Sequence, residues 1–403
     1  MKIWIVNHYA TSPERGSSTR HYSLAKELVK LGHQVTIIAA QTHHLVNSQY
    51  RHSPAVRLIE PDKKEGVNFL FLPTPIYKKN GISRLWNMLY FTWQVLQLPQ
   101  ELNTEVPDIV IGSSVHLFAV WAAERLANRF HVPFFFEVRD LWPQTLIDMK
   151  VLGKYHPLSI IFRLLEKYLY KKADKIITLL PYANEYIIQH GGHSKIIEYL
   201  PNGVELDKFK LISKNSKNTE NFTVMYLGSH GKANALDTLI EAAARLDQRE
   251  FYWRFIGEGP QKKLLQSKIE KLSLKNVKLE KKIKRKEVPQ TMEEADILVL
   301  NLLDLNIYKY GISLNKLFEY LASSKPIVFG CAARNNPVAE ANAGITVPPE
   351  DPNAMADAIK TLASLSPQER LEMGQRGRAY VEKYHSYQSL GKRLNTLIEE
   401  MVS

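Results

Sequence analysis

Residues 222–232 read Phe-Thr-Val-Met-Tyr-Leu-Gly-Ser-His-Gly-Lys, an apolar run that ends in a loop containing two glycines. A strand that is apolar along its whole length is typical of a parallel sheet buried on both faces. Similar runs alternate with segments of helical periodicity on either side of it, among them Gln34–Ala40, Pro133–Asp140 and Ile297–Leu303. This alternation predicts an α/β protein whose parallel sheets are covered by helices.

The domain organisation follows from length and from one change in composition. The chain has 403 residues, which at roughly 100–200 residues per domain suits two or three domains. Hydrophobic periodicity stops in 207–220, where Lys, Asn and Ser dominate. We therefore expect two doubly wound Rossmann-like domains, 1–203 and 221–383, joined by a linker at 204–220. A C-terminal helix at 384–403 is expected to pack back on the first domain.

The composition limits the kinds of partner, disulfide and catalytic site that the chain can have. Lys and Arg number 53 against 41 Asp and Glu, a net charge of +12 that favours anionic partners. The single cysteine, Cys331, excludes an internal disulfide and a cysteine-based zinc site. The sequence contains no D-x-D, H-E-x-x-H, G-x-S-x-G or P-loop pattern. No apolar run of about 18 residues is present, and the chain opens on a strand pattern; we expect a cytoplasmic protein.

Ligands of open α/β sheets bind beyond the carboxyl ends of the strands, so the loops that follow strands are the candidate sites. The first of four such loops is Gly311–Glu319. Ser313 or Asn315 is expected near the N-cap of the helix that follows, where free N–H groups attract anions. Lys316 adds a positive charge, and Glu319 lies on the same helix face. A cation for phosphate and a carboxylate for ribose suit a nucleotide diphosphate. The alternative is an ordinary helix with a surface Lys316–Glu319 pair.

The second loop is Leu227–Lys232, which follows the strand 222–227. Gly228 and Gly231 let the backbone approach a phosphate, and His230 or Lys232 would support it. The loop lacks the complete G-x-G-x-x-G pattern, so a plain turn between strand and helix is the alternative.

The third loop is Thr11–Tyr22, which includes the small residues Gly16 and Ser17. These permit close approach of a ligand, and Arg15 or Arg20 would meet its phosphate. A surface loop without a ligand is the alternative.

The fourth loop is Glu137–Pro143, where Arg139 and Asp140 end an otherwise apolar strand. Buried charges are costly unless they are paired, so charges at a strand's carboxyl end indicate cleft residues. An Arg139–Asp140 pair that only holds the loop is the alternative.

The segment 77–98 combines aromatic and basic residues. Trp86, Tyr90 and Trp93 are spaced i, i+4 and i+7 on a predicted helix, after Lys78, Lys79 and Arg84. Such a face suits the headgroup region of an anionic membrane. The alternative is that the aromatic side chains pack against the protein's own sheet.

Taken in their order along the chain, the four loops resemble those of the retaining GT-B glycosyltransferases of the group 1, or family 4, type. Further segments match the same family along nearly the whole chain, namely Lys30–Thr36, Leu200–Glu205, Phe255–Pro260 and Gly344–Pro352. The chain is most similar to WbuB-type enzymes of bacterial O-antigen and capsule assembly. The segments responsible are Glu137–Pro143, Gly228–Asn234 and Ser313–Tyr320.

The resemblance implies a GT-B fold whose first domain binds the acceptor and whose second binds the nucleotide sugar. It implies transfer, with retention, from a UDP-sugar to an undecaprenyl-diphosphate-linked glycan at the anionic inner membrane surface. No metal, other cofactor or nucleic acid is expected. The family has two glutamates eight positions apart, of which the second matches Glu319 and the first falls on Gly311, and this loss fits a deoxy or acetamido donor sugar. The similarity to WbuB-type enzymes points to N-acetyl-L-fucosamine. The family's Arg and Lys after the Gly228 position fall on Ser229 and Asn234.

The resemblance also implies the residue roles. Asp140, Lys316 and Arg139 are the expected catalytic residues. The expected nucleotide-sugar ligands are Gly16, Ser17, Gly228, His230, Lys232, Gly257, Ile283, Ser313, Leu314, Asn315 and Glu319. Three other functions fit parts of the pattern: a GT-B epimerase acting on UDP-N-acetylhexosamine, an NAD-dependent dehydrogenase, and a lectin-like protein without activity. The dehydrogenase lacks its G-x-G-x-x-G fingerprint.

Overall fold

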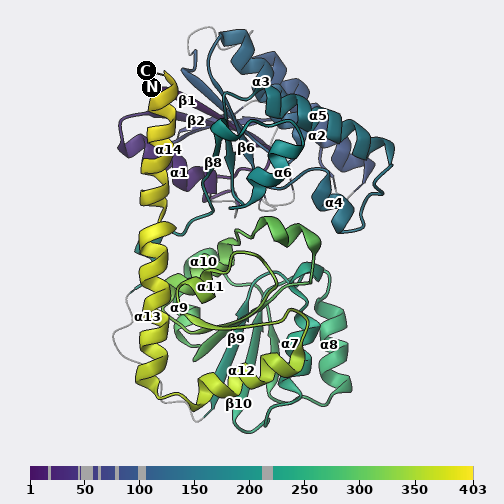
Figure 1. Cartoon of the computed structure of the whole chain (residues 1–403), viewed down its shortest axis with the longest axis vertical. Coiled ribbons are helices and arrows are strands. Elements are labelled where there is room, and N and C mark those ends of the chain that lie inside the picture. The colour runs from purple at the N-terminus through teal and green to yellow at the C-terminus, as the bar shows by residue number, and fades with distance from the viewer. Residues whose placement is uncertain are drawn as a thin grey trace. The chain divides into compact units, whose positions relative to one another are not determined.

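The computed structural model describes residues 1–16, 20–43, 46, 58–61, 65–77, 81–98, 106–210 and 221–402. The chain forms two compact units, Met1–Pro201 with Tyr387–Ser403, and Asn202–Ser386. Each unit is built around one sheet with helices on both faces (Figure 1). The expected doubly wound α/β fold is therefore confirmed.

The sheet of the first unit has the strand order β3-β4-β2-β1-β5-β6-β7-β8. Its strands are β1 (Lys2–Val6), β2 (Gln34–Ala40), β3 (Leu58–Pro61), β4 (Asn68–Leu72), β5 (Ile109–Ser113), β6 (Phe134–Val138), β7 (Lys175–Thr178) and β8 (Ile197–Tyr199). Neighbouring strands pair in parallel, except for the antiparallel edge strand β3, which the sequence analysis missed. The apolar residue Ile5 lies opposite Ile37 on one side and Ile111 on the other, in the centre of the sheet.

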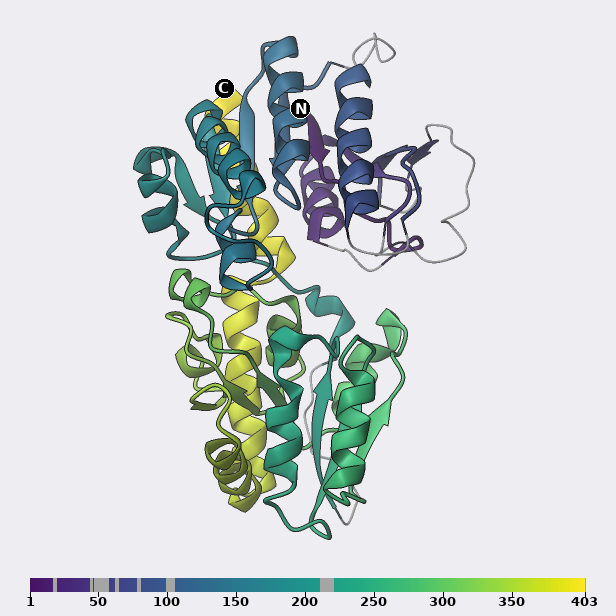
Figure 2. The same ribbon diagram turned by 90° about the vertical axis from the view of Figure 1, so that its right-hand side faces the viewer.

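Helices cover both faces of this sheet. They are α1 (Arg20–Lys30), α2 (Ile82–Gln97), α3 (Leu117–Phe130), α4 (Gln144–Asp148), α5 (Pro157–Lys172), α6 (Ala183–Gln189) and α14 (Tyr387–Val402), with a 3₁₀ turn at η3 (Ser194–Ile196). α2, α3 and α5 lie in sequence across one face (Figure 2). The final helix, α14, packs on α1, and a Cβ atom on Gly391 would lie 2.4 Å from the Cβ of Glu27. The expected return of the C-terminal helix to the first unit is confirmed.

The sheet of the second unit is parallel throughout, with the order β11-β10-β9-β12-β13-β14. Its strands are β9 (Phe222–Leu227), β10 (Phe251–Ile256), β11 (Val277–Glu280), β12 (Ile297–Asn301), β13 (Ile327–Gly330) and β14 (Gly344–Val347). Its α-helices are α7 (Leu236–Ala243), α8 (Lys262–Lys271), α9 (Val288–Glu293), α10 (Asn315–Ala322), α11 (Pro337–Glu340), α12 (Pro352–Ser364) and α13 (Pro367–Tyr384). Short 3₁₀ turns are η4 (Leu206–Lys208), η5 (Lys232–Asn234), η6 (Arg285–Glu287) and η7 (Asn306–Tyr310).

The chain passes between the units at Pro201/Asn202 and again at Ser386/Tyr387. The described part of the expected linker, 204–210, belongs to the second unit, because Val204 and Phe209 are buried in its core. The Val204 N–H donates to the His385 carbonyl at 2.8 Å, so the two crossing segments are bonded together. Residues 211–220 lie outside the described part of the chain. Among the described helices, none is both long and apolar enough to cross a membrane.

Candidate functional site

The second sheet changes direction at β9, because β10 and β11 follow on one side of it and β12 to β14 on the other. The connections that leave β9 and β12 therefore run to opposite sides of this point, at the carboxyl ends of the two strands. This is the place where doubly wound sheets bind their ligands. The loop 228–232 follows β9. The chain that leaves β12 passes through η7 and then forms helix α10.

Lys316, in the first turn of α10, provides the positive charge of this edge. Its Nζ donates to the Tyr226 hydroxyl at 3.0 Å and to the Asn234 Oδ1 at 2.5 Å, and lies 5.1 Å from the centre of the Tyr226 ring. Both acceptors are uncharged, and Lys316 forms no ion pair with a described carboxylate. Burial lowers the pKa of the Lys316 ammonium to about 8, and Glu319 opposes that shift. A partly buried cation that forms no ion pair with a described carboxylate favours an anionic ligand.

The acceptors of Lys316 are held by the loop that follows β9. Tyr226 donates its hydroxyl proton to the Ser229 carbonyl at 2.7 Å, and Asn234 donates to the same carbonyl at 2.9 Å. A Cβ atom on Gly228 would lie 2.9 Å from the Tyr226 oxygen and 3.2 Å from the Lys316 Nζ. A side chain at position 228 would thus crowd Lys316, which explains the glycine.

The glycines that follow β10 bring a second loop onto the first. A Cβ atom on Gly257 would lie 1.8 Å from the Gly228 carbonyl oxygen, and one on Gly259 would lie 2.4 Å from that of His230. Both positions therefore require glycine. The His230 ring is fully buried, and neither of its nitrogens has a described hydrogen-bond partner. Burial, then the charge of Lys262, lowers the pKa of His230 to about 4, so the ring is neutral near pH 7.

The start of α10 differs from the expectation. Its N-cap is Leu314, with no side-chain cap, and Asn315 is exposed at the first helical position. The Ser313 hydroxyl instead accepts the Asn202 N–H at 2.8 Å, and the Ser313 carbonyl accepts the Asn202 side chain at 2.6 Å. Ser313 and Asn315 thus lie directly before and after the N-cap, as expected, but neither side chain caps the helix, and the Ser313 hydroxyl bonds to Asn202 instead. The first turn of α10 therefore keeps its N–H groups uncapped by side chains.

Glu319 is buried one turn further along α10 and forms an ion pair with Arg285 of η6. Burial raises the pKa of the Glu319 carboxyl, and Arg285 opposes this. The contact uses Oε1, and no described residue bonds to Oε2. The ordinary alternative, a surface Lys316–Glu319 pair, does not form. Ile283, just before η6, is half-buried against the core.

Gly311 and Lys232 are two further positions that the sequence analysis singled out. Gly311 has φ +98°, a region that favours glycine, so a glutamate there would require a different backbone. Lys232 begins η5 with an exposed side chain.

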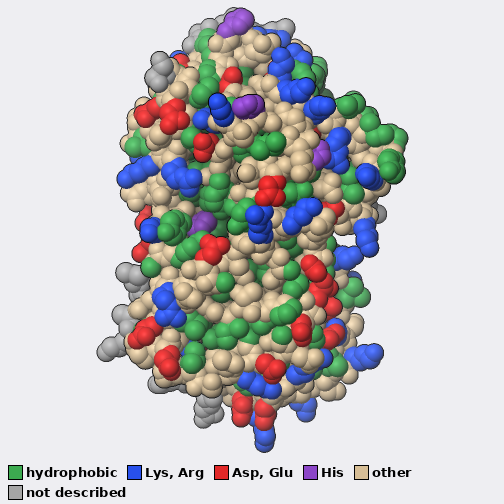
Figure 3. All heavy atoms as spheres, in the orientation of Figure 1, with side chains coloured by type: hydrophobic (Ala, Val, Ile, Leu, Met, Phe, Trp, Pro, Cys, Tyr) green, Lys and Arg blue, Asp and Glu red, His purple; other side chains and the backbone are tan. Residues whose placement is uncertain are grey.

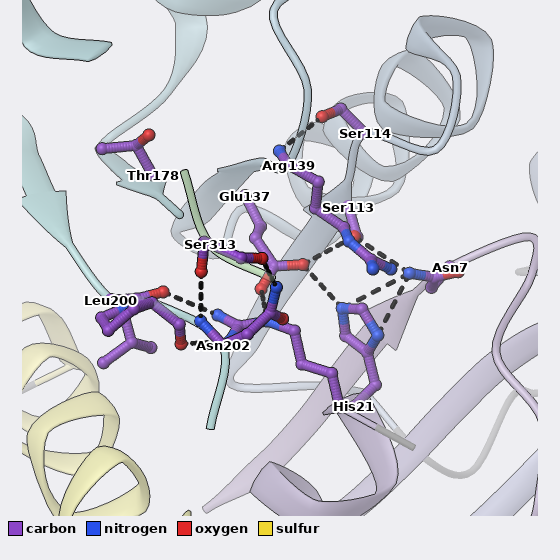
Figure 4. Close-up of polar contacts among 12 residues, drawn as sticks. Asn7, His21, Ser113, Ser114, Glu137, Arg139, Thr178, Leu200, Asn202 and Ser313 are labelled. Carbon is purple, nitrogen blue, oxygen red and sulfur yellow. Dashed lines mark hydrogen bonds and ion pairs between the residues drawn. The ribbon is translucent and has the colours of Figure 1, made fainter. Parts of the chain in front are cut away.

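In the first unit, polar side chains gather at the carboxyl ends of β1, β5 and β6 (Figure 4). Glu137 is at the centre: its Oε2 accepts from Ser113 at 2.6 Å and contacts the His21 ring at 2.6 Å, and its Oε1 accepts from Arg20 at 2.9 Å. Asn7 bonds to Ser113 at 3.0 Å and contacts His21. All five side chains are buried.

This network keeps Glu137 ionised. Burial alone would raise the pKa of Glu137, but His21 and Arg20 outweigh it and hold that pKa well below its usual range. Arg20 also donates to the carbonyls of Leu200 and Pro201, at the end of the first unit. The sequence analysis missed this network, because its members are far apart in the sequence and only the β1-β5-β6 strand order brings them together.

Arg20 is buried, and its guanidinium donates hydrogen bonds to Glu137 and to the carbonyls of Leu200 and Pro201. The expectation that Arg20 meets a phosphate was therefore wrong. Arg15 is likewise buried, with its guanidinium 4.4 Å from the centre of the Phe71 ring. Gly16 is half-buried in a bridge to Val46. Ser17 lies outside the described residues.

Arg139 and Asp140 follow β6, next to the Glu137 network. The Arg139 N–H donates to the Ser114 Oγ at 2.9 Å, which fixes the backbone where the strand ends. Asp140 is exposed, and no ion pair joins it to Arg139. No ion pair therefore supports the alternative of an Arg139–Asp140 pair that only holds the loop. Although the residue as a whole is exposed, burial of its carboxyl raises the pKa of Asp140, and the charge of Arg139 opposes this.

The helix α2 directs its aromatic face outward. Trp86 and Trp93 are exposed, and the half-buried Tyr90 ring lies 5.4 Å from that of Trp93. The side that packs inward carries Met88 and Phe91 instead. The alternative, in which the tryptophans pack on the sheet, was wrong. Arg84 donates to the Tyr9 hydroxyl at 3.0 Å, and Lys78 and Lys79 lie outside the described residues.

Within the described ranges, no cluster of three or more His, Cys, Asp or Glu side chains has the arrangement to hold a metal ion. This concerns only the protein's own side chains.

Solved structures of similar fold cover nearly the whole chain. Sucrose-phosphate synthase from Thermosynechococcus elongatus matches with a TM-score of 0.77 and 15% identity over 99% of this chain and 98% of that one. Anabaena HepE, solved with UDP and glucose, matches at 0.70 and 14% identity over 99% and 100%. WaaG, a glycosyltransferase involved in lipopolysaccharide biosynthesis, matches at 0.68 and 16% identity over 99% of both chains. At these identities the likeness shows the fold.

Sequence families show more. The model of the glycosyl transferase 4-like domain matches residues 15–203, and that of glycosyl transferases group 1 matches residues 221–364. No curated protein sequence matches the chain. With both matches in order and the GT-B fold around them, the chain belongs to the glycosyltransferases of GT-B type, with a 4-like first domain and a group 1 second domain.

Proposed function

We propose that this glycosyltransferase moves a sugar, with retention of anomeric configuration, from a UDP-sugar to a lipid-linked glycan. The observation that carries the proposal is the ammonium of Lys316, held by two neutral acceptors at the ligand edge of the second sheet. Donor transfer turns a nucleotide diphosphate into a leaving group, and the protein must stabilise its growing negative charge. A pre-positioned cation and the uncapped N–H groups of α10 supply that stabilisation.

We assign the other parts of the donor to residues at the same edge of the second sheet. The ribose hydroxyls are assigned to the Glu319 Oε2, which no described residue bonds. Gly228, His230, Gly257, Ser313, Leu314 and Asn315 are assigned to the donor, with Lys232 beside the diphosphate and Ile283 beside the base. Because Lys316 and the helix supply the positive charge, we assign no role to a metal ion or other cofactor.

The sugar itself is proposed from Gly311. The backbone at this position favours glycine, so no carboxylate stands where the wider family uses one to contact donor hydroxyls. A sugar that lacks a hydroxyl or carries an acetamido group fits this difference. N-acetyl-L-fucosamine is the donor that we would test first.

The acceptor is assigned to the first unit. Asp140 is exposed at the carboxyl end of β6, beside a backbone fixed by Ser114. We assign to Asp140 the orientation of the acceptor hydroxyl or the stabilisation of positive charge on the reacting sugar, with Arg139 as its neighbour. From the family resemblance, we keep Gly16 and Ser17 as proposed donor ligands.

The acceptor that we propose is an undecaprenyl-diphosphate-linked glycan of O-antigen or capsule synthesis, on the cytoplasmic face of the inner membrane. The outward face of α2, with Trp86, Tyr90 and Trp93, supports membrane contact, together with the basic residues Lys78, Lys79 and Arg84. The HepE structure with UDP and the lipopolysaccharide role of WaaG make the donor and the pathway reasonable to test.

The nucleotide is tested by thermal unfolding with UDP, GDP and NAD. A ligand at a hundred times its dissociation constant adds about 2.7 kcal/mol of stability, so the nucleotides should separate clearly. UDP should raise the unfolding temperature of the wild type, and at the same concentration it should raise that of Lys316→Ala much less. A rise with NAD alone would contradict the proposal.

The reaction is tested by incubating donor with and without acceptor. A transferase forms product only with acceptor, whereas the epimerase alternative converts the nucleotide sugar alone. The family match does not favour that alternative.

A further inference from the structure

The loop before α5 and the outer side of α5 expose large apolar side chains. Their exposed fractions are 82% for Tyr155, 64% for Leu164, 62% for Val151, 50% for Ile160, 49% for Ile161 and 46% for Met149. On α5, residues 160, 161 and 164 share one face, while Phe162 and Leu169 pack inward. Single exposed apolar residues are ordinary, but a group of this kind indicates an interaction surface.

The loop is fixed to the helix that follows it. The Ser159 hydroxyl donates to the Gly153 carbonyl at 2.8 Å, and the His156 N–H donates to the same carbonyl at 3.1 Å. At its other end, the Val151 N–H donates to the Leu146 carbonyl at 2.9 Å. Loop and helix thus present one continuous surface. We call it the α5 surface: Met149, Lys150, Val151, Lys154, Tyr155, Ile160, Ile161, Leu164, Lys167 and Lys171.

The charge of this surface has one sign. Lys150, Lys154, Lys167 and Lys171 are exposed, and the only acid between positions 149 and 172 is Glu166. Glu166 is buried and accepts hydrogen bonds from the hydroxyls of Tyr170 at 3.0 Å and Tyr186 at 3.2 Å. Burial raises the pKa of Glu166 to about 8, so it adds little negative charge near pH 7. Apolar residues beside lysines, without exposed carboxylates, match the boundary of an anionic bilayer.

The α5 surface continues toward α2. Both helices pack on α3, on the same face of the sheet (Figure 2). The outer side of α3 between them exposes Arg125 and Arg129. In the space-filling view, apolar side chains and Lys or Arg side chains gather along the edge of the first unit near α4 and α5 (Figure 3). The basic and apolar pattern therefore covers this helix layer.

We propose that the α5 surface docks on an anionic phospholipid bilayer. Ile160, Ile161 and Leu164 enter the boundary between headgroups and acyl chains, and Lys167 and Lys171 lie at the lipid phosphates. The inference rests on the proposed function only in its choice of a lipid acceptor, since binding to bilayers needs neither donor nor acceptor. It places the main docking contact on α5, where the sequence pointed to α2 alone.

The test is co-sedimentation of the full chain with vesicles of phosphatidylglycerol and phosphatidylcholine, or of phosphatidylcholine alone. Wild type should bind the anionic vesicles, less so at high salt. The double variant Lys167→Glu with Lys171→Glu should bind at least tenfold more weakly for each lysine replaced. Each substitution loses the attraction of one positive charge, roughly 1 kcal/mol, and adds a repulsion of similar size from the new negative charge. Ile161→Ser with Leu164→Ser should lower it at least tenfold. The matched control is Lys263→Glu with Leu264→Ser on α8, another exposed pair, which should bind like wild type.

Several outcomes would overturn the inference. These are wild type that ignores anionic vesicles, α5 variants that bind like the control, or reversible self-association that the apolar α5 variant abolishes. Unchanged unfolding temperatures establish that the variants fold, and a variant that unfolds is replaced by its single substitutions. Transfer to a short-chain, water-soluble acceptor should be equal in wild type and α5 variants. Vesicle binding without any transfer would refute the proposed function and leave the docking surface standing.

Discussion

Replacing Lys316 by methionine removes the charge while it keeps most of the side-chain volume. In the present structure the ammonium donates two hydrogen bonds to neutral groups and has no carboxylate partner. Its loss therefore leaves no unpaired buried charge, and the fold should tolerate the change. The unfolding temperature of the ligand-free variant should stay within a few degrees of wild type.

The effect on the reaction should be large. Loss of one donor aimed at developing negative charge costs about 10²- to 10³-fold in kcat, or roughly 2.7–4 kcal/mol. UDP, which carries the same diphosphate, should lose about 1.5–3 kcal/mol of binding, the usual contribution of a hydrogen bond to a charged group. Both losses come from one ammonium.

The assay is acceptor-dependent UDP release, with UDP affinity measured by calorimetry on the same preparations. Lys360→Met is the matched control, because Lys360 is an exposed lysine of α12 beside Asp357. It should behave like wild type. A Lys316→Met enzyme that is fully active and binds UDP normally would refute the placement of the diphosphate.

Three further results are expected. Because the pKa of Lys316 is lowered to about 8, kcat/KM for the donor should fall as pH rises through about 8, where the free enzyme loses this charge. The contribution of Lys316 to the free energy of unfolding should instead rise between about pH 8 and the ordinary pKa of a lysine, because the unfolded chain binds the proton more tightly. A donor profile that stays flat to pH 10 would contradict this. Asp140→Asn should slow transfer at least tenfold and leave UDP affinity unchanged by calorimetry; an equal loss of UDP binding would move Asp140 to the donor. Glu137→Gln should lower the free energy of unfolding by about 3–5 kcal/mol in urea, because Arg20 keeps a buried charge without its carboxylate, and a loss below 1 kcal/mol would show that the network is not ionised.

The sequence predicts strands well where burial decides them. The apolar runs at Gln34–Ala40 and Phe222–Leu227 are strands with those same bounds. β3 was missed because it is a short edge strand, where pairing with β4 decides the structure more than its own pattern does. The expected linker was placed by composition, but buried side chains at Val204 and Phe209 tie its first part to the second core.

The candidate site was predictable in part. The residue types around Lys316 and Glu319 indicate a nucleotide diphosphate, but their partners Asn234 and Arg285 are set by tertiary contacts that no local pattern contains. The Glu137 network shows the same limit. Arg20 looked like a phosphate ligand because a loop arginine and a buried arginine read alike until the carboxylate that faces it is known.

The central claim is tested most directly by incubating the enzyme with a panel of UDP-sugars and an undecaprenyl-diphosphate-linked glycan, and by analysing both products. Mass spectrometry would measure the added sugar, and NMR would give its anomeric configuration. We predict equal amounts of UDP and extended glycolipid, with the configuration of the donor retained and no product without acceptor. A changed nucleotide sugar in the absence of acceptor, or an inverted linkage, would contradict this function.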